Sequence, residues 1–135
     1  MNAAQQLVVG IDVGTQGTKA VAVDLVQAKV LARGSAKYEL IAGLPTGAAE
    51  QHPGAWSDAA QDCLKQISAQ GIDLGQVQAV GVSGQQHGLV LLDEDGAVVR
   101  PAKLWCDTST TQQAEELSER FGAPVPVGFT ASKVL

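Results

Sequence analysis

Residues 7–24, LVVGIDVGTQGTKAVAVD, contain the pattern that decides the fold. Two apolar runs, Leu7–Val13 and Ala20–Val23, flank a turn that contains two glycines. Short apolar runs around a glycine turn are typical of a β-hairpin. Glycines allow backbone N–H groups to converge on an anion, and Asp12 at the end of the first run could hold a divalent cation. The stretch therefore predicts a hairpin that binds a phosphate and a metal ion.

Asp12 also has a structural interpretation, because an aspartate at a strand end often bonds to the turn that follows it. The glycine-threonine turn and the apolar strands favour a functional role, since a carboxylate buried there would need a partner. Thr15 and Thr18 add hydroxyl groups near the same turn, and Lys19 adds a positive charge. Lys19 has an equally good interpretation as an ordinary exposed strand residue.

The composition describes one ordinary globular unit. The chain has 135 residues, of which 45% are hydrophobic and 17% are charged. A net charge of −5 argues against electrostatic binding to nucleic acid or to an anionic membrane. The two cysteines, Cys63 and Cys106, lie far apart and in no metal-binding spacing. A reduced, cytoplasmic protein is therefore expected.

Further strands are expected along the chain, bounded by turn residues. The runs are Ala28–Leu40, Val77–Val82, Gly88–Leu92 and Ala97–Arg100, and the last two are joined by a hairpin turn at Asp93–Gly96. The first three strands follow one another through short links, which predicts an antiparallel meander. No repeat or linker composition divides the chain.

Helices are expected where apolar residues recur every three or four positions. One begins after Pro53 and stops at Gly71. A second is predicted over Thr108–Arg120, with Phe121 packed inward, and a short third helix is predicted with Thr130 as its cap. These helices would cover the sheet.

Two downstream segments have side chains suited to a polyhydroxylated ligand. In SGQQHG, Gln86 and His87 lie between two apolar runs, where they could exchange hydrogen bonds with hydroxyl groups. An inert surface turn is an equally good interpretation of this segment. In LWCDTSTT, Trp105 could stack on a sugar and Asp107 could bind its hydroxyls, but a core tryptophan and a helix-capping aspartate are favoured on the residues alone.

Taken together, Val9–Asp24 and Ala79–Thr110 resemble a known family. They are similar to the amino-terminal part of the FGGY carbohydrate kinases, in particular the branch that acts on D-xylulose, within the actin/hexokinase/Hsp70-like ATPase superfamily. The hairpin alone indicates only the superfamily, whereas the combination GQxHG–LVLLD–G–RP–LW–D is far more specific. The resemblance covers essentially the whole chain. It implies an α/β, ribonuclease-H-like lobe whose mixed sheet begins with an antiparallel three-stranded meander flanked by helices.

The resemblance also implies an activity, the transfer of phosphate from Mg-ATP to the 5-hydroxyl of D-xylulose. Asp12 would then act on the Mg²⁺ ion, through water. The residues that would bind the phosphates of ATP form the hairpin turn: Gly14, Thr15, Gln16, Gly17, Thr18 and Lys19. The residues that would contact the sugar are Gln86, His87, Trp105 and Asp107. Residues 1–135 would be the N-terminal part of the first kinase domain.

Part of such a site is expected outside these residues. In the family, the catalytic base lies in a later segment and a second domain binds adenine, so the chain by itself is expected to have no useful kinase turnover. Ribulose, gluconate and glycerol remain alternative substrates, and a non-catalytic sugar- or nucleotide-binding module is the alternative class. A homodimer is one possible assembly. An actin- or Hsp70-like ATPase shares the hairpin but does not explain Gln85–His87 or Trp105.

Overall fold

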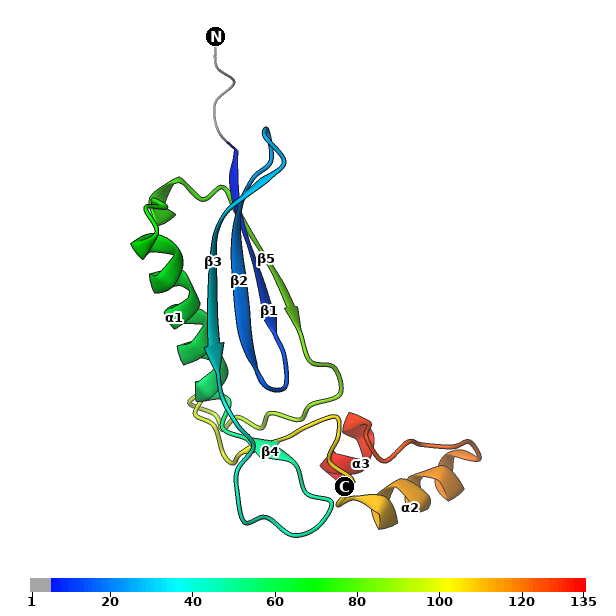
Figure 1. Cartoon of the computed structure of the whole chain (residues 1–135). Coiled ribbons are helices and arrows are strands. Elements are labelled where there is room, and N and C mark those ends of the chain that lie inside the picture. The colour runs from blue at the N-terminus through cyan, green and yellow to red at the C-terminus, as the bar shows by residue number, and fades with distance from the viewer. Residues whose placement is uncertain (1–5) are drawn as a thin grey trace. The chain divides into compact units, whose positions relative to one another are not determined.

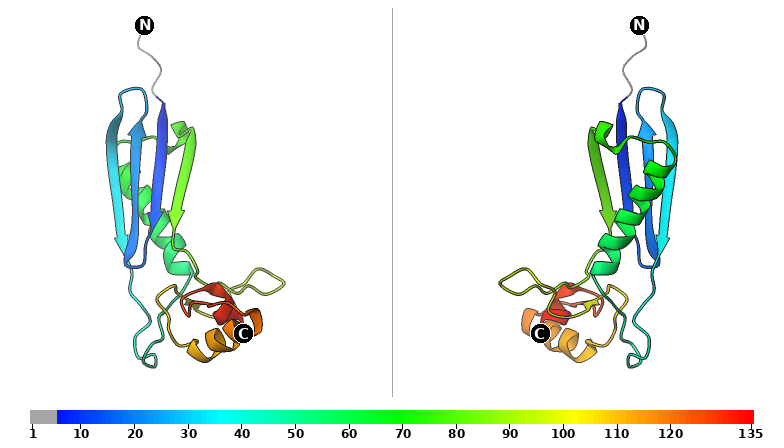
Figure 2. Two further views of the ribbon diagram at one scale, coloured as in Figure 1. Left: turned by 90° about the vertical axis from the view of Figure 1, so that its right-hand side faces the viewer. Right: turned by 90° about the vertical axis from the view of Figure 1, so that its left-hand side faces the viewer.

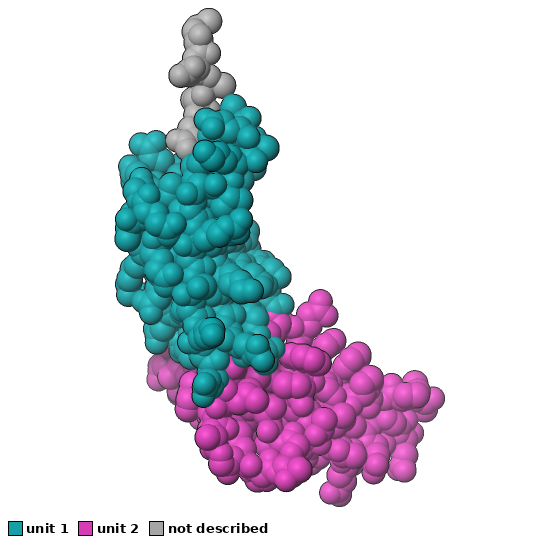
Figure 3. Space-filling model, viewed as in Figure 1, with its two compact units in different colours: residues 1–39, 54–84 teal, residues 40–53, 85–135 magenta. Residues whose placement is uncertain are grey.

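A computed structural model describes residues 6–135, which form two compact units (Figure 3). The first unit contains the residues up to Glu39 together with Gly54–Gly84. The second contains Leu40–Pro53 and Gln85–Leu135. Each unit is thus assembled from two separate stretches of the chain.

The first unit is built on a four-stranded sheet in the order β3-β2-β1-β5 (Figure 1). The strands β1 (Leu7–Val13), β2 (Gly17–Asp24) and β3 (Lys29–Lys37) are antiparallel neighbours, which confirms the predicted meander. The strand β5 (Ala79–Gly84) returns to pair in parallel with β1, so the sheet is mixed. Figure 2 shows these strands side by side, with one helix crossing the sheet.

That helix, α1 (Gly54–Ala69), covers one face of the sheet. Alternate residues of the strands point toward it, as a half-buried sheet requires. The buried cluster between sheet and helix consists of Leu7, Val9, Ile11, Ala20, Ala22, Ala32, Cys63 and Ile67. A Cβ placed on Gly34 of β3 would lie only 2.4 Å from the carbonyl oxygen of Cys63, so glycine allows the helix to approach the strand closely.

The chain reaches β5 through a glycine stop and a short 3₁₀ turn at Leu74–Gln76. Gly71 has a φ of 93°, a left-handed conformation suited to ending the helix. The strand begins at Ala79 and extends through Ser83 and Gly84, so the predicted end of this strand at Val82 is wrong. Every residue of β5 is exposed, because α1 packs mainly on β3 and β2, at the other side of the sheet.

The second unit has little regular sheet. The strand β4 (Glu50–Gln51) pairs antiparallel with β6 (Ala102–Lys103), and one isolated bridge joins Leu89 to Lys103. The predicted strand pair at Gly88–Leu92 and Ala97–Arg100 is reduced to a single further bridge. Its apolar side chains are largely exposed and therefore have no buried face to stabilise a ladder.

The turn between those segments forms as predicted. The N–H of Gly96 donates to the carbonyl of Asp93, and Gly96 has a φ of 80°. The Asp93 side chain accepts from the N–H groups of Asp95 and Ala97, as aspartate commonly does in turns.

Two helices complete this unit, α2 (Thr111–Phe121) and α3 (Thr130–Val134). Gly122, with a φ of 66°, ends α2 as predicted. Phe121 is 72% exposed, so the prediction that it packs inward is wrong. Thr130 is the first residue of α3 and not its cap. Within residues 6–135, no helix is long and apolar enough to cross a membrane.

Candidate active site

The turn between β1 and β2 is held by backbone and by one tyrosine. The N–H of Gly14 donates to the carbonyl of Gly17 at 3.0 Å, and the Tyr38 hydroxyl donates to the carbonyl of Gly14 at 2.6 Å. A Cβ on Gly17 would lie 2.5 Å from the carbonyl oxygen of Ala36, so another residue there would collide with β3. The turn therefore has a fixed shape before any ligand arrives.

Asp12 and Lys19 face each other across this hairpin. They are directly paired in the antiparallel register, and Ser83 of β5 is paired with Asp12 on its other side. All three residues are exposed, on the face of the sheet opposite α1. The interpretation of Asp12 as a buried carboxylate is therefore wrong. A hollow of about 450 Å³ lies over this row, with Gly10 and Gly81 in its lining.

This row fits one carboxylate contact to a magnesium ion. Mg²⁺ is usually held by one or two carboxylates, with water and substrate phosphates as its other ligands. Among residues 6–135 there is no group of three His, Cys, Asp or Glu side chains that could hold a metal by itself. A magnesium ion at Asp12 would therefore need phosphate and water as its other ligands, and Lys19 lies beside Asp12 as a positive charge.

The other residues of the hairpin turn lie in different surroundings. Thr18 is only 1% exposed and shares the face of Ala20, toward α1, with its hydroxyl 3.3 Å from that of Tyr38. Gln16 is exposed and Thr15 is half-buried. The structure thus directs Thr18 into the core and leaves Gln16 at the surface.

In the second unit, three of the four predicted sugar contacts, Gln86, His87 and Trp105, line a pocket. Gln85, Gln86, His87 and Trp105 surround a volume of about 270 Å³. Gln86 and His87 are exposed, and Trp105 is 52% exposed, which rules out the interpretation of Trp105 as a core residue. The pocket therefore combines an aromatic ring with amide and imidazole groups, the chemistry that recognises a polyol.

His87 is fixed from two sides by residues that sequence reasoning missed. Its backbone φ is 57°, and its carbonyl accepts a hydrogen bond from the Lys133 ammonium at 2.6 Å. Its imidazole stacks on the ring of Phe129, with centroids 4.1 Å apart and an interplanar angle of 9°. The sequence carries no local signal of these contacts, because α3 lies far along the chain from His87.

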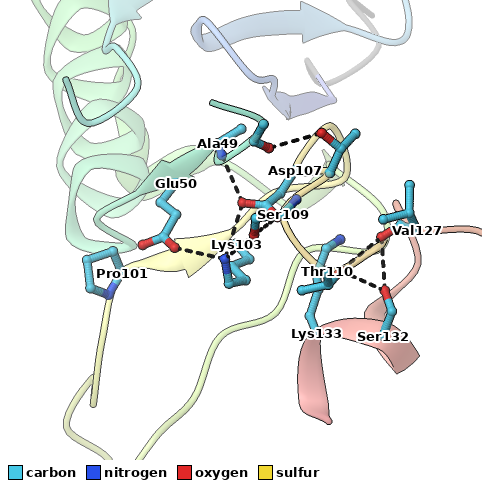
Figure 4. A network of polar contacts seen from close by, with 12 residues as sticks. Ala49, Glu50, Pro101, Lys103, Asp107, Ser109, Thr110, Val127, Ser132 and Lys133 are labelled. Atoms are coloured by element: carbon cyan, nitrogen blue, oxygen red, sulfur yellow. Dashed lines mark hydrogen bonds and ion pairs between the residues drawn. The ribbon is translucent and has the colours of Figure 1, made fainter. Parts of the chain in front are cut away.

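Asp107 is fully buried and occupied by internal contacts (Figure 4). One carboxylate oxygen accepts from the N–H of Ala49 at 2.8 Å and lies 3.4 Å from the Lys103 ammonium. The other accepts from the N–H of Ser109 at 3.0 Å and from its hydroxyl at 2.6 Å. These contacts join two segments of the chain, and Asp107 does not line the pocket beside Trp105.

The charges around Asp107 form a small network. Burial by itself raises the pKa of Asp107, but hydrogen bonds from Ser109 and Ala49 and the positive charge of Lys103 hold that pKa below its usual value. Lys103 also lies 3.1 Å from Glu50, which is in turn 2.5 Å from Arg100. The network links the loop before β4 to the segment after β6.

The predicted site residues therefore divide between the units. The hairpin residues and Asp12 belong to the first unit, and Gln86, His87, Trp105 and Asp107 belong to the second. Within each unit the exposed members lie together, whereas Thr18 and Asp107 are buried.

Comparison with known proteins places these observations in a family context. Residues 7–133 match the N-terminal domain of the FGGY family of carbohydrate kinases. The chain is 42% identical to the xylulose kinase of Haemophilus influenzae over 93% of its own length, and it spans only 28% of that relative. The structure of a "xyloylose kinase" from Brucella ovis matches 96% of this chain and 28% of its own, with 32% identity and a TM-score of 0.86. A gluconate kinase structure from Lactobacillus acidophilus matches 87% of this chain and 23% of its own, with 31% identity and a TM-score of 0.76.

Proposed function

Since this chain belongs to the FGGY family of carbohydrate kinases, we propose that it forms the sugar- and phosphate-binding part of an enzyme that phosphorylates D-xylulose with ATP. The 42% identity to a xylulose kinase over nearly the whole chain is the observation that carries this proposal. The pocket beside Trp105 and the polar row around Asp12 support it, because they offer the two kinds of contact that the reaction needs.

In this proposal, residues of the first unit bind the phosphates of ATP. Asp12 would hold Mg²⁺ through water, and Lys19 would stabilise negative charge on the phosphates. The hairpin turn, with its shape fixed by Tyr38, would present backbone N–H groups. The metal ion supplies neutralisation of the phosphate charge when it is bound. The chain's own part is to position the phosphates relative to the acceptor.

In this proposal, residues of the second unit bind the sugar. Gln86 and His87 would exchange hydrogen bonds with the hydroxyls of the ketose, and Trp105 would cover an apolar face of the sugar. We propose that Asp107 contributes indirectly, because its oxygens are already occupied by Ala49, Ser109 and Lys103. A sugar hydroxyl could reach Asp107 only by displacing one of these contacts.

We further propose that the catalytic base and the adenine site come from residues outside this chain. Positioning of both substrates provides most of the catalysis in phosphoryl transfer, and a general base contributes a factor of about 10² to 10⁴. The chain alone would therefore bind ligands without useful turnover. Closure of the complete site would exclude water as a competing acceptor.

A coupled kinase assay tests the assignment. The product of the complete reading frame is assayed with D-xylulose, D-ribulose, L-ribulose, gluconate and glycerol, and D-xylulose is expected to give the highest kcat/KM. Trp105→Ala should raise the KM for the sugar about tenfold, whereas the matched control Phe121→Ala, at another exposed aromatic residue, should leave it unchanged. Phosphorylation of none of these compounds, together with phosphorylation of a non-sugar, would overturn the proposal.

A second candidate is a kinase of another sugar, which the likeness to a gluconate kinase structure favours. The same panel separates the two, since a gluconate kinase would prefer gluconate to D-xylulose. Titration calorimetry of residues 1–135 with D-xylulose addresses the remaining alternative, a binding module. Heat of binding without turnover in the complete product would support that class.

A further inference from the structure

We propose that Lys133 and Phe129 are positioning residues that hold His87 in the conformation in which it binds the sugar. This inference rests on the proposed function, because it assigns His87 to the sugar pocket. Neither residue lines that pocket. Both act through His87, Lys133 on its backbone and Phe129 on its ring.

The backbone contact is made by a buried ammonium group. Lys133 is 8% exposed, and its Nζ donates to the carbonyl of His87 and to that of Gly128, each at 2.6 Å. A positively charged donor makes short, strong hydrogen bonds in such surroundings. The two carbonyls lie far apart in sequence, so the single side chain joins the polar turn at His87 to the start of α3.

The hydrogen bond from Lys133 is made to a residue with an unusual backbone conformation. The φ of His87 is 57°, a value found in only a few per cent of residues other than glycine. Such a conformation persists when the surroundings determine it, and it is commonly found at ligand-binding positions. The Lys133 bond to the His87 carbonyl is one such determinant. Without it, the peptide that precedes Gly88 would be free to turn, and the imidazole would leave its place in the pocket.

The ring contact is made by the residue before α3. Phe129 lies nearly parallel to the imidazole of His87, with the ring centroids 4.1 Å apart. One face of the imidazole is therefore covered, and the ring can rotate only by losing this contact. Its nitrogens lie in the ring plane, and stacking leaves them available for hydrogen bonds to hydroxyl groups.

The same segment also meets the other wall of the pocket. A Cβ on Gly128 would lie 2.5 Å from the carbonyl oxygen of Trp105, so the backbone at Gly128 packs directly on that residue. Residues 128–133 thus contact both His87 and Trp105, two of the four residues that line the pocket. The segment therefore contacts residues that line the pocket, and its sequence should determine how well the pocket is preorganised.

The test uses the product of the complete reading frame with the variants Lys133→Met and Phe129→Leu. Each variant has an apolar side chain of similar length or bulk. Lys133→Met removes the hydrogen bond to the His87 carbonyl, and Phe129→Leu removes the ring stacked on the imidazole. We expect the KM for the sugar to rise about tenfold or more in Lys133→Met, with the KM for ATP changed less than about twofold. Lys133→Arg keeps the positive charge and N–H donors and should recover part of the loss.

Ser132→Ala is the matched control. Ser132 is buried in the same helix and bonds to Thr110 and to the carbonyls of Val127 and Phe129, but it forms no hydrogen bond with His87 and no contact with the Phe129 ring. It should lower the melting temperature without raising the KM for the sugar. If Ser132→Ala raises that KM as much as Lys133→Met does, the effect is a general loosening of α3 and the inference is overturned.

A second measurement does not depend on turnover. The imidazole protons of His87 should show an upfield ring-current shift in the NMR spectrum, and Phe129→Leu should remove it. Unchanged His87 shifts in that variant would overturn the inference even in a folded, active protein. Absence of any sugar kinase activity in the unmodified protein would instead contradict the proposed function, so the two failures are distinguishable.

Discussion

The substitution Asp107→Asn keeps the shape of a fully buried side chain and removes its charge together with one of its acceptors. In the structure, both oxygens of Asp107 accept hydrogen bonds, one from Ala49 and the other twice from Ser109. An asparagine can keep its oxygen toward Ser109, but its amide group then faces the N–H of Ala49 and the ammonium of Lys103. Rotation of the amide only moves the conflict between donors to the other side.

The magnitude follows from these contacts. A hydrogen bond to a charged group contributes about 1.5–3 kcal/mol, and a buried donor left without an acceptor costs about 1–3 kcal/mol. Because the two effects overlap at the N–H of Ala49, we expect the second unit to lose about 3 kcal/mol of local stability. That corresponds to on the order of a 100-fold increase in the opening equilibrium.

Amide hydrogen exchange measures this change directly. Protection at the amides of Ala49 and Ser109 should fall on the order of 100-fold in Asp107→Asn. The matched control is Asp62→Asn, because the Asp62 side chain is 55% exposed and pairs with Lys65 on the surface of α1. That pair should contribute less than about 0.5 kcal/mol. Protection at Ala49 that stays within about threefold of the unmodified protein would refute the assignment of Asp107 to a structural role.

Three further predictions concern acid stability, packing and thiol reactivity. The folded-state pKa of Asp107 lies below its usual value, so its stabilising effect is present above about pH 4 and is lost as the pH falls through the folded-state pKa. In Asp107→Asn, the free energy of unfolding measured by denaturant titration should therefore fall less steeply with decreasing pH. Gly34→Ala should lower the free energy of unfolding by about 1–3 kcal/mol, because the new methyl would collide with the backbone of Cys63, whereas Gly10→Ala, with its nearest atom at 3.6 Å, should change it far less. A thiol reagent should label Cys106 well before Cys63, since Cys63 is fully buried and burial raises its pKa; equal rates would contradict the packing of α1.

The meander and the helix of the first unit were predictable because their signals are local, whereas the parallel pairing of β5 with β1 joins distant segments and was not predicted. The hairpin and the meander follow from alternating apolar residues with glycine between them, and α1 follows from the helical spacing of Ala60, Cys63 and Ile67. The stops at Gly71 and Gly122 are equally local, since both residues adopt positive φ.

The second unit was less predictable because its structure depends on distant residues. The segments around Leu92 and Val98 have strand-like composition, but they remain mostly exposed and form only one bridge. The role of Asp107 depends on Ala49, and the conformation of His87 depends on Lys133. Both contacts join residues far apart in the sequence, so they produce no helical or strand periodicity. The sequence therefore pointed to Asp107 and His87 but not to the residues that hold them.

The interleaved order of the two units has a consequence for synthesis. The meander of β1, β2 and β3 uses neighbouring segments and can form as soon as it leaves the ribosome. The next segment, which contains β4, finds its pairing strand only when β6 has been made, and before that the chain must complete α1 and β5. We therefore expect β4 to remain exposed and unpaired while the first unit folds. Protease pulses on ribosome-bound chains of increasing length should cut near Glu50 until residues 102–103 have emerged.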